Sequence, residues 1–323
     1  MIIHTSEIAI SKLPQVQLDS SYPLRDVVHM VLAGGPSQTL YNLETGTHQR
    51  AVEYLCRDAR GAIGEDKRGN PYFILDRTNR LNESLGIFSV AGVRFERVEI
   101  VTPRGNQGTL RDIADAAMSS YCEDSREKSW SLMLFSIYPG IHAEWHNDRG
   151  ELQSVERILE SESARPYGEG CCFGSHRLEG IAFALRRFCL ENDVEPSQLD
   201  GVWLDAYEYL YGAIQLIKSH QRDDGSLQRS WFRKKKIPTG PSELREAFKD
   251  VASMRHRDAA LVYVTGHCLD AISSLGEFLP AEQEWIQRAS YILAQTIENH
   301  WTTIGRDIGS LTHAIHALKL LAV

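Results

Sequence analysis

The segment GSHRLEGIAFAL at residues 174–185 returns in altered form as KSHQRDDGSL at 218–227, TGHCLDAISSL at 265–275 and LTHAIHAL at 311–318. In each copy a histidine is followed three positions later by a second polar residue, which gives four pairs: His176 with Glu179, His220 with Asp223, His267 with Asp270, and His313 with His316. Residues three apart share one face of a helix, so each helical copy would present two titratable side chains next to one another. The pattern is suited to moving protons.

The spacing of the copies predicts the architecture. Successive histidines are 44, 47 and 46 residues apart, at positions 176, 220, 267 and 313. A period of this length built from helix pairs is typical of a helical repeat array or a closed ring, because no single unit can bury its apolar face alone. We therefore predict an all-α protein, an α/α toroid that occupies residues 1–323 as one domain, with small-residue-rich inner helices and amphipathic outer helices.

Apolar residues recur with helical periodicity along most of the chain. The predicted helices cover residues 24–32, 47–56, 110–121, 130–137, 152–160, 176–190, 202–219, 242–254, 265–278, 281–300 and 308–321. Residues 57–103 break this pattern, since apolar residues alternate there near 93–100 between glycines. We expect a small irregular or β insertion over 57–103.

The composition of the chain argues against nucleic acids and membranes as binding partners. The formal net charge of -8 provides no overall attraction for nucleic acid or an anionic membrane. No stretch approaches the roughly 18 to 20 apolar residues of a membrane-spanning helix, and the opening MIIHTSEIAI lacks the basic and apolar regions of a signal peptide. We expect a cytoplasmic protein with a small-molecule substrate, and the sequence leaves its oligomeric state open.

The six cysteines form no Cys-x-x-Cys pair, and most are expected to be buried thiols. Cys172 and His176 are spaced i, i+4 at a predicted helix start, and thiolate plus imidazole is a ligand set for zinc. Two ligands do not make a site. A zinc site would need further ligands from another repeat, with His267 or His313 as the candidates; otherwise no cofactor is predicted.

One motif carries a resemblance to a known family. Gln221, Asp224, Gly225 and Ser226 resemble the repeat of the terpenoid cyclase and prenyltransferase superfamily of α/α toroids, in which a glutamine precedes Asp-Gly-Ser and an aromatic residue. Here Leu227 stands where the aromatic residue is expected. The resemblance implies the toroid fold for the second half of the chain and a structural role for the motif. It implies a reaction only weakly, because the Asp-x-Asp-Asp acid of squalene cyclases is absent from the sequence.

Histidine and carboxylate pairs around a common bore favour acid–base chemistry on a small polar substrate, sugar-like or anionic, of lyase or isomerase type. The predicted catalytic residues are His176 and His267 as acid and base, Glu179 and Asp270 as orienting carboxylates, and His313. The predicted substrate-binding residues are Arg177, Trp145, His220, Asp223 and His316. The basic run at 233–236 is either a lid for an anionic group or a solvated loop.

Two other functions stay open. The resemblance implies a cyclase or prenyltransferase acting on an isoprenoid. A bore whose histidines are all satisfied structurally would instead belong to a non-catalytic repeat module that binds a peptide or small ligand. An enzyme is distinguished by perturbed titratable groups that converge at one place.

Overall fold

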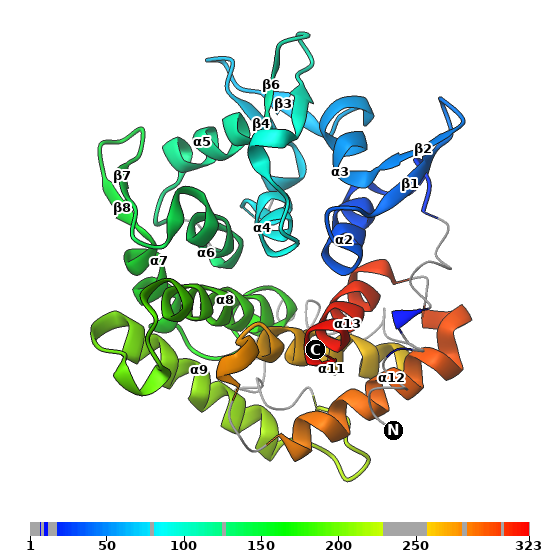
Figure 1. Ribbon diagram of the computed structural model, residues 1–323, viewed down its shortest axis with the longest axis vertical. Coiled ribbons are helices and arrows are strands. Elements are labelled where there is room, and N and C mark those ends of the chain that lie inside the picture. The colour runs from blue at the N-terminus through cyan, green and yellow to red at the C-terminus, as the bar shows by residue number, and fades with distance from the viewer. Residues whose placement is uncertain are drawn as a thin grey trace, which may run out of the picture.

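The computed structural model describes residues 18–77, 81–124, 127–228, 257–279, 283–304 and 307–322, together with residues 7, 10 and 11 (Figure 1). The fold is mostly helical, as predicted. Its α-helices are α2 (Leu24–Gly34), α3 (Ala51–Glu53), α4 (Glu83–Val90), α5 (Leu110–Ser120), α6 (Ser129–Phe135), α7 (Val155–Ser163), α8 (Ser175–Asn192), α9 (Gly201–Ser219), α11 (Arg257–Ser273), α12 (Glu284–Ile304) and α13 (Ile308–Leu321). The predicted helix at 242–254 and the basic run at 233–236 lie outside the described residues.

Short helical turns and small sheets connect these helices. The π-helical turns are η2 (Tyr54–Asp58) and η5 (Ser136–Gly140), and the 3-10 turns are η3 (Leu75–Arg77), η4 (Phe95–Arg97), η6 (Cys171–Gly174), η7 (Pro196–Gln198) and η9 (Gly276–Phe278). The strands form antiparallel pairs: β1 (Thr39–Asn42) with β2 (Thr47–Arg50), β3 (Ile63–Glu65) with β4 (Pro71–Phe73), β5 (Glu99–Val101) with β6 (Gln107–Thr109), and β7 (Glu144–His146) with β8 (Leu152–Ser154).

Six helices contact one another in a closed sequence around the centre of the molecule. α2 packs against α4, α4 against α6, α6 against α8, α8 against α11, α11 against α13, and α13 returns to α2 (Figure 1). The inner position of α6 follows from its sequence SWSLMLF, which has no charged face and is buried at every residue. These helices carry most of their side chains into one continuous apolar core.

Glycines set the closest approaches within this ring. A Cβ atom at Gly180 of α8 would lie 2.9 Å from the carbonyl oxygen of Ser129 in α6, and one at Gly266 of α11 would lie 2.9 Å from the Cβ of Ala314 in α13. Any larger residue would push the paired helices apart. The small residues of the repeated segment therefore determine how near the inner helices stand.

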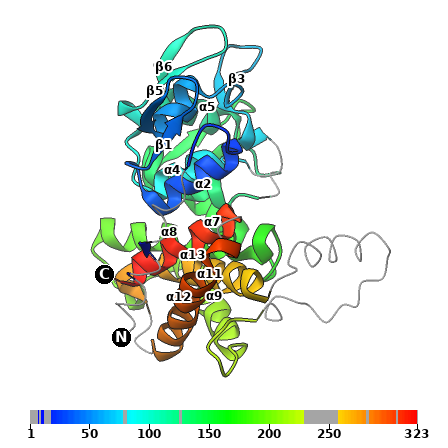
Figure 2. The same cartoon turned by 90° about the vertical axis from the view of Figure 1, so that its right-hand side faces the viewer.

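Further helices pack outside this ring. α9 lies against α7 and α8, and α12 lies against α11 and α13. α12 buries one stripe of apolar residues and exposes Gln287 and Arg288, which is the amphipathic pattern predicted for an outer helix. Seen from the side in Figure 2, β3, β5 and β6 lie at one end of the molecule and α9 and α12 at the other. No described helix is both long enough and apolar enough to cross a bilayer.

The irregular part differs from the prediction in two ways. Residues 47–56, predicted as a helix, begin with strand β2 and continue into α3 and η2, because Thr47–Arg50 pairs with Thr39–Asn42 rather than with its own chain neighbours. The predicted insertion at 57–103 contains the inner helix α4 between its strands, and the pairs β1–β2 and β7–β8 fall outside it. Tertiary pairing overrides local periodicity at these places.

The motif that carries the resemblance forms a turn after α9, called here the rim turn (residues 221–227). The side-chain Nε2 of Gln221 donates to the carbonyl oxygens of Gly225, at 2.8 Å, and of Trp285, at 2.7 Å. The amide of Leu227 donates to Oγ1 of Thr265 at 3.2 Å. The rim turn thereby fastens the end of α9 to the start of α12 and to α11.

Candidate functional site

Four histidines from four inner helices meet at the centre of the ring. His29 comes from α2, His176 from α8, His267 from α11 and His313 from α13. The ring centroids of His267 and His313 are 4.2 Å apart, those of His176 and His313 5.2 Å, and those of His29 and His313 5.6 Å. None of the four is more than 4% exposed. So many buried polar rings are costly unless their nitrogens are paired, and the pairing determines what the site can do.

Asp270 binds His313 and a further histidine of α13, His316. Its Oδ2 lies 2.6 Å from Nδ1 of His313 and its Oδ1 lies 2.6 Å from Nδ1 of His316, and the carboxyl is fully buried. Burial acts to raise the pKa of Asp270, but the two histidines together lower it below its usual value. An ionised Asp270 accepts a hydrogen bond from each Nδ1–H, so Nε2 of His313 carries no proton. That Nε2 has no hydrogen-bond partner among the described residues.

Glu179 lies next to this pair. One ligand atom each from Glu179, Asp270 and His313 lie within 4.8 Å of one another, and Oε1 of Glu179 has no partner in the described part of the chain. Burial and the charge of Asp270 raise the pKa of Glu179 well above its usual value. Burial and the neighbouring His267 lower the pKa of His313 well below its usual value. A protonated carboxyl of Glu179 therefore faces a neutral imidazole of His313.

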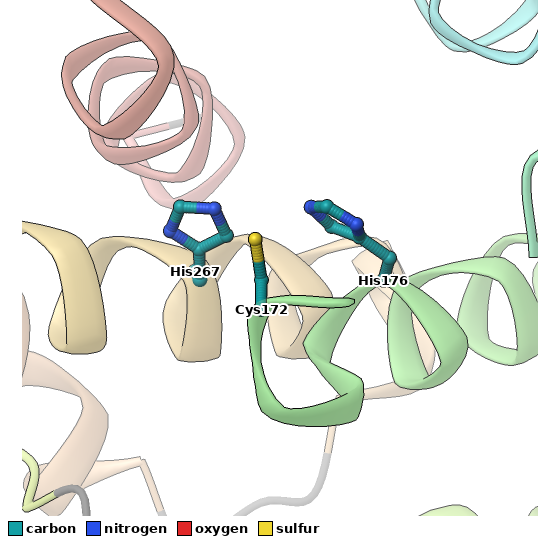
Figure 3. Close-up of side chains that lie close together, drawn as sticks. All are labelled: Cys172, His176 and His267. Atoms are coloured by element: carbon teal, nitrogen blue, oxygen red, sulfur yellow. The ribbon is translucent and has the colours of Figure 1, made fainter. Parts of the chain in front are cut away.

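Cys172 joins the cluster from η6, just before α8. The ligand atoms of Cys172, His176 and His267 lie within 4.8 Å of one another (Figure 3). Burial acts to raise the pKa of the Cys172 thiol, but His176 and His267 lower it well below its usual value. Burial acts to lower the pKa of His176, whereas Cys172 and Glu127 raise it well above its usual value. Both shifts favour a thiolate beside an imidazolium when nothing else is bound.

Several residues that the sequence pattern predicts for the site do lie in the cluster. Their hydrogen-bond partners differ from those predicted. His176, Glu179, His267, Asp270, His313 and His316 all reach the cluster. Asp270 is predicted to orient His267, but it binds His313 and His316 instead. Nδ1 of His267 lies 2.8 Å from the carbonyl oxygen of Tyr263, one turn earlier in the same helix.

Four predicted substrate-binding residues lie away from the cluster. His220 ends α9, with its Nδ1 2.9 Å from the carbonyl oxygen of Leu216, and Asp223 is exposed. The guanidinium of Arg177 is buried against Glu162, at 3.3 Å. Trp145 stands in β7, where its Nε1 donates to the carbonyl oxygen of Met118 at 3.1 Å. His220, Arg177 and Trp145 are thus engaged in holding the fold, and Asp223 faces solvent.

Two members of the cluster were not predicted. His29 lies 3.7 Å from Oε1 of Glu83 through its Nε2, and burial lowers its pKa to about 3, with His176 and His267 contributing. Oε1 of Glu127 lies 3.4 Å from Nδ1 of His176. His29 could have been found as the single polar residue of the run VVHMVL at 27–32. Glu127 offers no comparable signal, because it precedes α6 in an ordinary polar stretch.

In comparison with family models, curated proteins and solved structures, this chain matches none.

Proposed function

We propose that this protein is an α/α-toroid enzyme that carries out acid–base chemistry on a small polar substrate at the centre of its helical ring. The closed sequence of six inner helices and the rim turn support the toroid, and with it the fold-level resemblance to the terpenoid cyclases and prenyltransferases. The observation that carries the reaction class is the hydrogen bond from His313 to Asp270, which leaves Nε2 of His313 free beside Glu179.

Each member of this trio has a distinct role in the proposal. His313 takes a proton from the substrate through Nε2, and Asp270 holds its ring in the required tautomer and stabilises the imidazolium that forms. Glu179 delivers a proton to the opposite part of the substrate and recovers it later. A proton taken at one atom and returned at another is the basis of a lyase or an isomerase.

The pattern of unpaired atoms supports this proposal over a module whose histidines are all satisfied structurally. Buried polar atoms of a purely structural cluster are nearly always satisfied. Here Nε2 of His176, Oε1 of Glu179 and Nε2 of His313 have no hydrogen-bond partner within the described ranges. Unpaired acceptors and donors at one place favour a site that completes its bonds with a substrate. The same polarity disfavours an isoprenoid, whose carbocation intermediates are protected by apolar and aromatic walls.

The test measures the exchange of substrate protons with solvent. This exchange can be followed for many compounds in one mixture, so the substrate need not be known beforehand. Pools of small sugars, hydroxy acids and keto acids are incubated with the protein in deuterated water, and mass spectrometry follows deuterium uptake and new products. We expect at least one compound to exchange or react with the native protein and with His220→Gln, the matched control at the rim. His313→Gln should remove this activity by at least about a hundredfold while remaining folded. Full activity in His313→Gln would refute the assigned base.

A further inference from the structure

The Cys172 thiol stands between the imidazoles of His176 and His267 (Figure 3). Their three ligand atoms lie within 4.8 Å of one another. In a tetrahedral zinc site, with bonds of about 2.3 Å to sulfur and about 2.0 Å to nitrogen, ligand atoms are about 3.3 to 3.6 Å apart. The three side chains would have to close by no more than about 1.5 Å, which rotation of the side chains can supply.

Both histidines already have the outer partner that metal-binding histidines usually have. Nδ1 of His267 is 2.8 Å from the Tyr263 carbonyl oxygen, and Nδ1 of His176 is 3.4 Å from the Glu127 carboxylate. Such partners fix the tautomer and leave Nε2 for the metal. Nε2 of His176 is buried and has no hydrogen-bond partner among the residues that the structure describes. This nitrogen is therefore available to a metal beside the Cys172 thiol.

The backbone before α8 directs Cys172 toward these nitrogens. Cys172, Phe173 and Gly174 are all left-handed, with φ of 47°, 57° and 79°. A left-handed conformation at two successive residues other than glycine is costly and concentrates at functional sites. It folds Cys172 back over the first turn of α8, where His176 lies four positions later.

We propose that Cys172, His176 and His267 bind a zinc ion at the centre of the ring. A thiolate with two imidazoles is a zinc ligand set, and three protein ligands leave the fourth position open, as in catalytic rather than structural zinc sites. The ring of His313 lies against those of His267 and His176, so His313 stands next to the proposed metal site.

The zinc site has a consequence for the substrate that rests on the proposed function. A carbonyl or carboxylate oxygen of the substrate would occupy the fourth position. When His313 takes the proton from the neighbouring carbon, the electron pair of the broken C–H bond would move onto that oxygen to give an enolate, and Glu179 would protonate the enolate to form the product. The substrate class is therefore a small hydroxy or keto compound with an oxygen next to an acidic C–H bond. The binding of zinc itself does not depend on this reaction.

The same residues could act without metal, with the Cys172 thiolate as a nucleophile and His176 as its base. Metal analysis separates the two roles. The full chain is purified without chelators and its metal content is measured by mass spectrometry; we expect about one zinc per chain. Cys172→Ser and His267→Gln should each lower the zinc content at least tenfold. Cys189→Ala, a buried cysteine later in α8, and His220→Gln should both keep it.

Cobalt provides a second readout on the native protein, in case a ligand variant fails to fold. Chelated protein reloaded with Co²⁺ should show a thiolate-to-cobalt charge-transfer band, absent from Cys172→Ser and present in Cys189→Ala. Native protein that is folded and binds neither Zn²⁺ nor Co²⁺ would overturn the inference, as would rapid alkylation of Cys172 in the presence of excess zinc. Zinc bound with the predicted ligands but unaffected turnover in His313→Gln would uphold the metal site and refute the proposed acid–base roles alone.

Discussion

The centre of the ring and the rim turn both contain a copy of the same histidine and acid pattern. The two copies differ in where the pair lies relative to its helix. At the centre, His267 and Asp270 lie within α11, and Asp270 reaches across to His313 on α13. At the rim, His220 ends α9 and Asp223 is exposed. The spacing of histidine and acid is the same, whereas their position in the helix differs. Within a helix, a histidine and an aspartate three residues apart both point into the core. At the end of a helix, the aspartate falls in the following turn and is exposed.

The two regions also differ in how their polar atoms are satisfied. In the rim turn, Gln221 donates to two carbonyl oxygens, and Oδ1 of Asp224 accepts from the amide and hydroxyl of Ser226. At the centre, several buried nitrogens and oxygens are left without partners in the described structure. The rim turn therefore stabilises the fold, whereas buried polar atoms without partners at the centre lower its stability.

The largest expected effect tests whether Asp270 is the anchor of the centre. Asp270→Ala removes the acceptor for two buried Nδ1–H groups and should lower the free energy of unfolding by about 3 to 5 kcal/mol. The matching rim variant Asp223→Ala should change it by less than about 0.5 kcal/mol. Equilibrium unfolding in urea measures both. Equal effects at the two positions would erase the distinction between centre and rim.

The next effect compares Asp270 with Asp76, a buried carboxyl that has no cationic partner in the described part of the chain. Burial raises the pKa of Asp76 to about 7, and the hydrogen bonds from Ser84 only partly oppose this. Because the folded state favours the protonated form, its contribution to stability is full below about pH 4, the usual pKa of an aspartate, and is lost as the pH rises through the folded-state pKa. As the pH rises from about 5 to about 8, the free energy of unfolding should fall by about 2 to 3 kcal/mol because of Asp76.

Asp76→Asn should remove this part of the pH dependence. The native protein should lose about 2 to 3 kcal/mol of stability between about pH 5 and pH 8, and the variant should not show this loss. Unfolding in urea at the two pH values measures the difference. Asp148→Asn, a change at an exposed carboxylate, is the control and should leave the slope unaltered. A native slope that persists in Asp76→Asn would show that other groups cause it.

A smaller effect tests the backbone of the rim turn. Gly225 has φ of 91°, and a Cβ there would lie 2.8 Å from the Arg288 carbonyl oxygen. Gly225→Ala should cost about 2 kcal/mol or more. Gly69 has φ of 88° and open space around it, so Gly69→Ala should cost only about 1 kcal/mol. The melting temperature of each variant measures its cost. The difference between Gly225→Ala and Gly69→Ala gives the cost of the contact with Arg288 of α12. Neither variant should change the zinc content.

The smallest effect concerns a single side chain of the rim turn. Gln221→Glu keeps the size of the residue but cannot donate to the carbonyl oxygens of Gly225 and Trp285, and should cost about 1 to 2 kcal/mol. Metal binding and proton exchange should stay at the native level after correction for the folded fraction. A loss of turnover in well-folded Gln221→Glu would mean that the rim turn takes part in the reaction.

The sequence predicts most of the described helices and three of the four central histidines, His176, His267 and His313, but not their hydrogen-bond partners. Periodicity places His267 and Asp270 on one face of a helix. It cannot show that Asp270 bonds to His313, because that bond joins α11 to α13 and depends on how closely Gly266 lets these helices approach. The strand at Thr47–Arg50 escapes prediction for a similar reason, since its partner strand, and not its own periodicity, decides its conformation.

The contact of α2 with α13 closes the ring and brings His29 to His313. On a ribosome, α2 emerges long before α13, and the loop between the two helices is closed only once α13 has emerged. The polar centre therefore cannot assemble before α13 has been made, and until then the apolar faces of the earlier inner helices stay uncovered. Translation that stops before α13 would leave a partly helical chain without a site and exposed to aggregation, so this protein is expected to depend on chaperones during synthesis.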